Sequence, residues 1–211
     1  MSAVSMQRLG DVAEFVRGIT FKPDDVIDIN APDAVVCMRT KNVQADLDVS
    51  DLLAIPPSFV KRPDKYLNEG DILVSTANSW NLVGKCCWVP KLNMKATLGG
   101  FISALRSTST NLDGRYLYHW FSFDPVQTLV RNCARQTTNI ANLSFDQCLG
   151  GVDKFEPVSG GGEVDHSEEA VGQLVVAGGN GAIDLEMAEH ALDAIALSVE
   201  HPIIMDFHTA V

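Results

Sequence analysis

Short apolar runs separated by polar turns form the main pattern in the first part of this 211-residue chain. Residues 35–38 (VVCM) are rich in β-branched side chains and lead into polar RTKN, which is typical of a buried strand ending at a loop. The same criteria predict strands at 71–75, 85–89 and 101–106, the first of them entered through a turn at 68–70.

Two segments have spacings that favour helical structure. Residues 114–133 carry apolar side chains at intervals of three and four, which predicts a helix interrupted at Asp124-Pro125, because proline cannot continue a preceding helix. Residues 8–17 (RLGDVAEFVR) fit either a short strand or one helical turn before a loop at Gly18. Since strands and helices alternate without a regular βαβ rhythm, we expect an α+β domain with a mixed, mainly antiparallel sheet and flanking helices.

The composition changes at Gly150-Gly151, and a flexible joint, Ser159-Gly160-Gly161-Gly162, follows. We therefore predict one domain over residues 1–150 and an unrelated acidic tail over residues 151–211, part of which need not fold. Inside the tail two short elements are expected, a strand at 174–177 and an amphipathic helix at 183–199.

The charge supports the same division. The whole chain has a net charge of −11, but residues 1–150 hold 15 Lys and Arg against 15 Asp and Glu, whereas the tail holds one basic residue against 12 acidic ones. Residues 52–150 alone carry 10 basic and 6 acidic residues. A positive surface that could meet phosphate groups is therefore compatible with the first part, although not with the tail.

Catalytic signatures are missing from the sequence. It has no Walker loop, H-E-x-x-H or G-x-S-x-G string, and its five cysteines form no C-x-x-C pair. We expect the cysteines to be reduced packing residues, and we expect no cofactor, no metal, no membrane span and a cytoplasmic protein. A small enzyme using the tail's Gly178-Gly179-Asn180-Gly181 loop and its histidines is the least favoured of the alternatives.

Six sequence blocks in a fixed order carry a family resemblance. They are LGDV at 9–12, RTKNV at 39–43, YLNEGDILVS at 66–75, NLVGK at 81–85, YLY at 116–118 and QTTNIANLS at 136–144. This succession resembles the target recognition domains of the specificity subunits of type I restriction-modification systems, over about residues 7–149.

The resemblance implies a module that binds double-stranded DNA and does no chemistry, since methyl transfer and cleavage belong to partner methyltransferase and restriction subunits. The family's long spacer helix and second recognition domain do not follow Leu149 here, so we expect a truncated half-subunit that could pair with a second specificity half-subunit. The alternative is an interaction protein or non-functional fragment that docks a methyltransferase subunit or half-subunit without reading DNA itself.

Direct reading of a base sequence needs donors and acceptors on loops that face the major groove. Three loops offer them, and the candidate DNA-binding residues are Arg39, Thr40, Lys41 and Asn42, then Asn78, Ser79, Asn81 and Lys85, then Arg131, Arg135, Gln136, Thr137, Thr138 and Asn139. Arg135 and Gln136 suit a base or a phosphate, and Lys41 and Lys85 suit phosphates. For each residue the competing interpretation is an ordinary solvated loop side chain.

Other conspicuous residues have structural explanations. Asp71 in the G-D-I-L context is expected to fix the turn before its strand by accepting hydrogen bonds from backbone N–H groups. His119 lies in an aromatic stretch and is expected to be packed, as are Trp80, Trp88 and Trp120 rather than stacked on flipped bases.

Overall fold

The structure is a computed structural model, and it describes residues 7–155 except Asn111, Thr138 and Val152. The strand and helix predicted at 174–177 and 183–199 lie outside the described residues. In the described part no helix is long and apolar enough to cross a bilayer.

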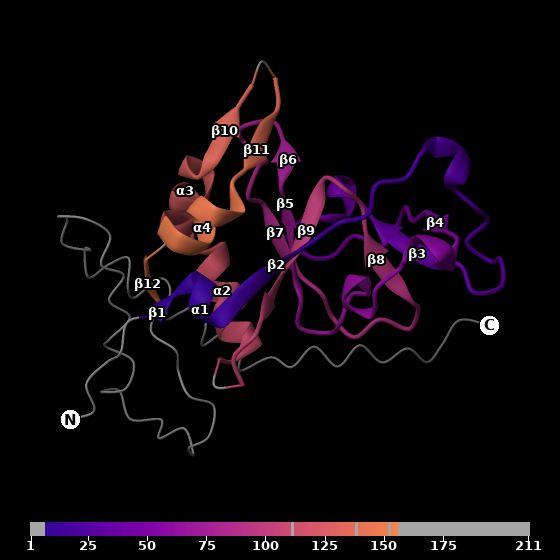
Figure 1. Ribbon diagram of the computed structural model, residues 1–211, viewed down its shortest axis with the longest axis horizontal. Helices are drawn as coiled ribbons and strands as arrows, with labels where there is room; N and C mark the ends of the chain where they lie inside the picture. The colour runs from indigo at the N-terminus through magenta and orange to yellow at the C-terminus, as the bar shows by residue number, and fades with distance from the viewer. Residues whose placement is uncertain (1–6, 111, 138, 152, 156–211) are drawn as a thin grey trace. The chain divides into compact units, whose positions relative to one another are not determined.

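Twelve strands and four α-helices, with short 3-10 turns, make up the described part (Figure 1). The strands are β1 (Gln7–Arg8), β2 (Ala13–Arg17), β3 (Val35–Met38), β4 (Ala54–Ile55), β5 (Ile72–Ser75), β6 (Ala77–Asn78), β7 (Cys86–Trp88), β8 (Ala96–Leu98), β9 (Ile102–Ser107), β10 (Ala134–Gln136), β11 (Ala141–Leu143) and β12 (Asp153–Phe155). The helices are α1 (Leu9–Val12), α2 (Gly114–Ser122), α3 (Asp124–Asn132) and α4 (Phe145–Gly151), and the 3-10 turns are η1 (Pro23–Asp25), η2 (Thr40–Asn42), η3 (Pro57–Phe59) and η4 (Pro63–Lys65).

The strands form one central sheet and three smaller ones. The central sheet has the order β2-β9-β5-β7 and is antiparallel throughout. A second sheet, β4-β3-β8, contains the parallel pair β3–β8, and a third has the order β10-β11-β6. The prediction of an α+β fold with mainly antiparallel pairing is confirmed.

The predicted elements are found close to their expected places. Each of the four predicted strands is present, and the predicted helix is split into α2 and α3 at Phe123, with proline in the first turn of α3. The segment 8–17 holds both alternatives in succession, the single helical turn α1 and then the strand β2. Strand β12 pairs with β1, so the described fold continues past residue 150. The domain boundary expected at residue 150 remains a prediction.

The central sheet is buried on both faces. In β5, Ile72 and Val74 belong to an apolar cluster with residues of α2 and α3, whereas Leu73 between them belongs to a second cluster with Val36 and Met38 of β3. Side chains alternate between the faces of a strand, so a strand covered on both sides needs a continuous apolar run. The run ILV in β5 meets this requirement, and helices cover one face while the β4-β3-β8 sheet covers the other (Figure 1).

A buried ion pair joins the residue just before β5 to β9. Arg106 donates from Nε and Nη2 to the two carboxylate oxygens of Asp71, at 2.7 Å each, and its remaining donors reach the carbonyl oxygens of Asp64 and Tyr66. Asp71 is 2% exposed and also accepts from the backbone N–H of Asn68 at 2.9 Å, which confirms its expected role in the turn. The hydrogen bonds to Asp71 raise the pKa of Arg106 above its ordinary value.

A close backbone approach explains the glycine at the end of β2. A Cβ atom on Gly18 would lie 1.9 Å from the carbonyl oxygen of Gly99 and 2.8 Å from that of Ile102. Both obstacles are backbone atoms, one just after β8 and one at the start of β9, so they cannot turn away as a flexible side chain could. Only glycine lets the two segments pass this closely.

We expect Gly18→Ala to lower the free energy of unfolding by about 1–3 kcal/mol, because the added methyl group overpacks a backbone contact. The matched control is Gly150→Ala in α4, where a Cβ would meet nothing within 4 Å. That variant should be neutral or more stable by up to about 1 kcal/mol, since alanine favours a helix over glycine. Chemical denaturation of both variants measures the difference, and equal effects would contradict the close approach.

We expect Asp71→Asn to destabilise the protein by about 3–5 kcal/mol, because an amide nitrogen would replace one of the oxygens facing the buried Arg106 guanidinium. The control is Arg62→Gln, which removes the exposed ion pair between Arg62 and Asp64. Solvent screens such a pair, so this variant should unfold at nearly the wild-type denaturant concentration. Denaturant titrations measure the free energy of unfolding of both variants. A mild effect of Asp71→Asn would show that water reaches the ion pair between Asp71 and Arg106.

Candidate nucleic-acid interface

The third sheet carries a projecting β-hairpin, β10–β11, drawn at the top of Figure 1. Arg135 pairs with Asn142 and Gln136 with Ala141 in its antiparallel register. The hairpin closes where the backbone N–H of Thr137 donates to the carbonyl oxygen of Ile140 at 3.0 Å. Of the residues predicted for the third loop, Arg135, Gln136, Thr137 and Asn139 therefore lie on a two-stranded ribbon or in the turn that joins its strands.

The two faces of this ribbon differ in character. Ala141 and Leu143 of β11 are buried in the apolar cluster under α2 and α3, whereas Asn142 between them is exposed. Directly paired residues on antiparallel strands project from the same face, so Arg135 lies beside Asn142 on the outer face. The alternation of A-N-L marks Asn142 as an outward residue, a signal that the sequence prediction did not use.

Strand β6 brings the second predicted loop to the same sheet. Asn142 pairs with Ala77 and Ala141 with Asn78, so the loop that begins at Asn78 starts beside the ribbon. The Asn78 side chain donates to the Ser75 hydroxyl and accepts from the Ser79 backbone N–H, which fixes the start of the loop. Ser79 and Asn81 are exposed. Two of the three predicted loops are thus adjacent.

The first predicted loop is largely neutralised from within. Arg39 donates to the carboxylate and the carbonyl oxygen of Asp51, and Lys41 forms an ion pair with the same carboxylate. One acidic residue therefore holds both cations of the loop. Neither cation is as available to a phosphate as the sequence alone suggests.

The prediction that Asn42 contacts DNA is wrong. Its side chain is fully buried, accepts from the backbone N–H of Arg39, and donates to the carbonyl oxygens of Asp48 and Asp51. With its amide group used in these three hydrogen bonds, Asn42 holds the loop's backbone in place and does not reach solvent.

Lys85 lies near the first loop although it is distant in sequence. Its ammonium group donates to the side-chain oxygen of Gln44 at 2.6 Å, and Gln44 in turn donates to the carbonyl oxygen of Lys41. The partner of Lys85 is neutral, so its positive charge remains available. Its expected role on a phosphate stays a prediction.

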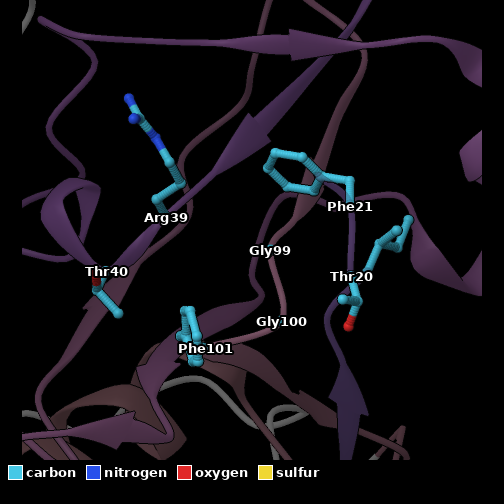
Figure 2. Close-up of a pocket in the computed structure, with 8 residues that line it drawn as sticks. Thr20, Phe21, Arg39, Thr40, Gly99, Gly100 and Phe101 are labelled. Atoms are coloured by element: carbon cyan, nitrogen blue, oxygen red, sulfur yellow. The ribbon is translucent and has the colours of Figure 1, made fainter. Parts of the chain in front are cut away.

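The remaining candidate residues that the structure describes lie on α3, on the hairpin and at the wall of a pocket. Arg131 lies near the end of α3, where its guanidinium donates to Thr128 in the preceding turn. Arg135, Gln136, Thr137 and Asn139 are all exposed, while Thr138 is outside the described residues. Thr40 lines an open pocket together with Phe21, Arg39 and Phe101 (Figure 2).

Burial and hydrogen bonding shift the pKa values of several side chains in the described part of the chain. Burial raises the pKa values of the Cys37 and Cys87 thiols to about 12, and burial also lowers the pKa of His119. A hydrogen bond with Cys148 lowers the pKa of the Cys133 thiol to about 7, but that pair packs within the apolar cluster of α3 and α4. Between residues 7 and 155, apart from the three undescribed positions, no group of three His, Cys, Asp or Glu could hold a metal ion.

Comparison with known proteins found similar sequences among the specificity subunits of type I restriction enzymes. The specificity subunit of the type I restriction enzyme StySPI from Salmonella potsdam is 26% identical over 140 residues, and that of EcoKI from Escherichia coli K12 is 25% identical over 138. Each alignment covers 64% of this chain and 29% of the relative, so the chain spans less than a third of these proteins. No family model matches the chain.

Solved structures agree on the fold. The HsdS subunit from Thermoanaerobacter tengcongensis aligns with 95% of this chain and 39% of its own length, at 13% identity and a TM-score of 0.53. A structure of a type I restriction-modification system, concerned with complex assembly and conformational transition, aligns with 95% of this chain and 40% of its own, at 13% identity and a TM-score of 0.55. The chain is therefore homologous in sequence to part of the specificity subunits of type I restriction enzymes, and it shares the fold of the two solved structures.

Proposed function

We propose that this chain is a sequence-specific DNA recognition module that does no chemistry of its own. The observation that carries the proposal is the β10-β11-β6 sheet, which brings two predicted loops to one exposed edge. The exposed donors and acceptors gathered there are those of Ser79, Asn81, Arg135, Gln136, Thr137, Asn139 and Asn142, while Asn78 holds the start of its loop.

The shape of this edge suits the major groove. A B-DNA major groove is about 12 Å wide and admits a two-stranded ribbon, which is the form that β10–β11 takes. Arginine pairs bidentately with guanine, and asparagine or glutamine with adenine. With Arg135 and Asn142 side by side on the outer face, the ribbon offers both kinds of base contact at neighbouring positions.

The proposed setting is a type I restriction-modification complex in the cytoplasm. Type I complex assembly is the subject of one of the similar structures, and the named relatives are specificity subunits of restriction enzymes. We propose that methyltransferase and restriction subunits are partners, and that a second half-subunit supplies the rest of the recognition site.

The proposal is tested by selection of the full chain on a randomised duplex pool at two salt concentrations. An enriched sequence at both concentrations supports it. Absence of enrichment, with the protein folded by circular dichroism, contradicts independent reading. If the chain then co-purifies with a methyltransferase subunit, the alternative of a docking protein is favoured.

We expect Arg135→Ala to weaken binding to the selected duplex by about 5- to 150-fold, because a bidentate base contact contributes about 1–3 kcal/mol of discrimination. The variant should also relax the preference at one base pair. Arg62→Ala is the control, since Arg62 is an exposed arginine outside the three loops. Fluorescence anisotropy with the selected duplex and its point variants measures both effects, and an unchanged preference would remove Arg135 from direct reading.

Lys85→Ala should weaken binding about equally for all sequences and reduce the slope of log K against log salt by about 0.9, the value for one lost phosphate contact. Lys41→Ala should reduce the slope less, because Asp51 already neutralises that ammonium group. Binding isotherms at several salt concentrations provide the two slopes. A larger change for Lys41 than for Lys85 would reverse the assignment.

A further inference from the structure

Phe101 is the most exposed of the large apolar side chains in the described part of the chain. Its exposed fraction is 66%, against 50% for Ile140 and 49% for Val49. Leaving an aromatic ring in water forgoes the free energy of burying it, and exposed apolar groups of this kind commonly mark binding sites. Phe101 belongs to none of the three predicted loops and is not among the residues of the proposed function.

The backbone beneath the ring is firmly held. Phe101 lies in a turn closed by a hydrogen bond from the Ile102 N–H to the Gly99 carbonyl oxygen at 3.0 Å. Its own carbonyl oxygen accepts from the N–H groups of Thr76 at 2.9 Å and Ala77 at 3.2 Å. A ring presented by fixed backbone loses little conformational freedom when it meets a ligand, so it can act as a rigid anchor.

This turn lies between the parts of the proposed interface. Ala77, bonded to the Phe101 backbone, begins β6 and pairs with Asn142 of the ribbon. On its other side Phe101 borders a pocket of about 390 Å³ whose lining includes Phe21, Arg39 and Thr40 (Figure 2). The ring therefore lies between the first predicted loop and the ribbon.

The occupant that fits this place is an apolar group on a DNA base edge. Within the major groove the C5-methyl group of thymine is the apolar feature, and phenylalanine contacts it favourably. Thymine also presents its O4 acceptor beside the methyl group, and Thr40 on the pocket wall carries a hydroxyl that can donate. One thymine thus matches both the ring and the polar group near it.

We propose that Phe101 is a specificity-determining residue that contacts the C5-methyl group of a thymine in the recognised sequence. The inference rests on the proposed function, because it assumes that the ribbon and the loops beside it face DNA. It adds an apolar reader to an interface otherwise made of hydrogen-bonding groups, and it names the base that this reader selects.

The test replaces thymine by uracil, which lacks the methyl group but keeps every hydrogen-bonding group. Each thymine of the selected duplex is replaced in turn, and the affinity of the full chain is measured by anisotropy. We expect one position to lose about fourfold in affinity, the value for burying one methyl group. Phe101→Ala should bind the thymine duplex more weakly and show no further loss with uracil at that position.

Met94→Ala is the matched control, because Met94 is also a large exposed apolar side chain, at 40%, and lies outside the proposed interface. It should keep the full uracil effect, and circular dichroism should show both variants folded. A uracil effect that persists in Phe101→Ala, or wild-type binding insensitive to every replacement, overturns the inference while the proposed function stands. Failure of the wild-type chain to select any sequence overturns both.

Discussion

The burial of the central sheet on both faces is the constraint on which the rest of the structure depends. Each strand must supply apolar side chains to two clusters, and each face needs a layer to cover it. Helices α2 and α3 cover one face and the β4-β3-β8 sheet covers the other. Because the Gly99 N–H bonds the Met38 carbonyl and the Thr76 N–H bonds that of Phe101, the ends of β3, β5 and β8 meet the beginning of β9. Strand β6, which follows β5, leads from this junction to the β10-β11-β6 sheet of the proposed interface.

Electrostatics inside the fold decides which charges remain for a partner. Arg106 is fully engaged by Asp71 and two carbonyl oxygens, so it stabilises the sheet and is lost to binding. Asp51 similarly occupies Arg39 and Lys41. Arg135, which is exposed, keeps its positive charge on the ribbon, and Lys85, whose partner is neutral, keeps its charge near the first predicted loop. A count of basic residues therefore overstates the available charge, and the acidic residues that reduce it lie within the same fold.

Two different means of presenting side chains are combined at this edge. The ribbon β10–β11 places residues by strand register, which fixes Arg135 and Asn142 on one face. The turn at Phe101 places a ring by backbone hydrogen bonds to β6. Both are coupled to the central sheet through β6, so a shift of one part would displace the other. Such rigidity is what discrimination between similar base edges requires, because misplaced donors leave polar groups unpaired.

The sequence by itself determined the local elements, because local rules govern them. The VVCM strand, the helix break before Pro125 and the turn role of Asp71 all follow from side-chain pattern and backbone chemistry. Only the tertiary structure decided that Ala77–Asn78 pairs with β11, that Asn42 is buried while Asn142 is exposed, and that Phe101 lies between two loops. A two-residue strand has no measurable periodicity, and the exposure of a polar side chain depends on contacts distant in sequence.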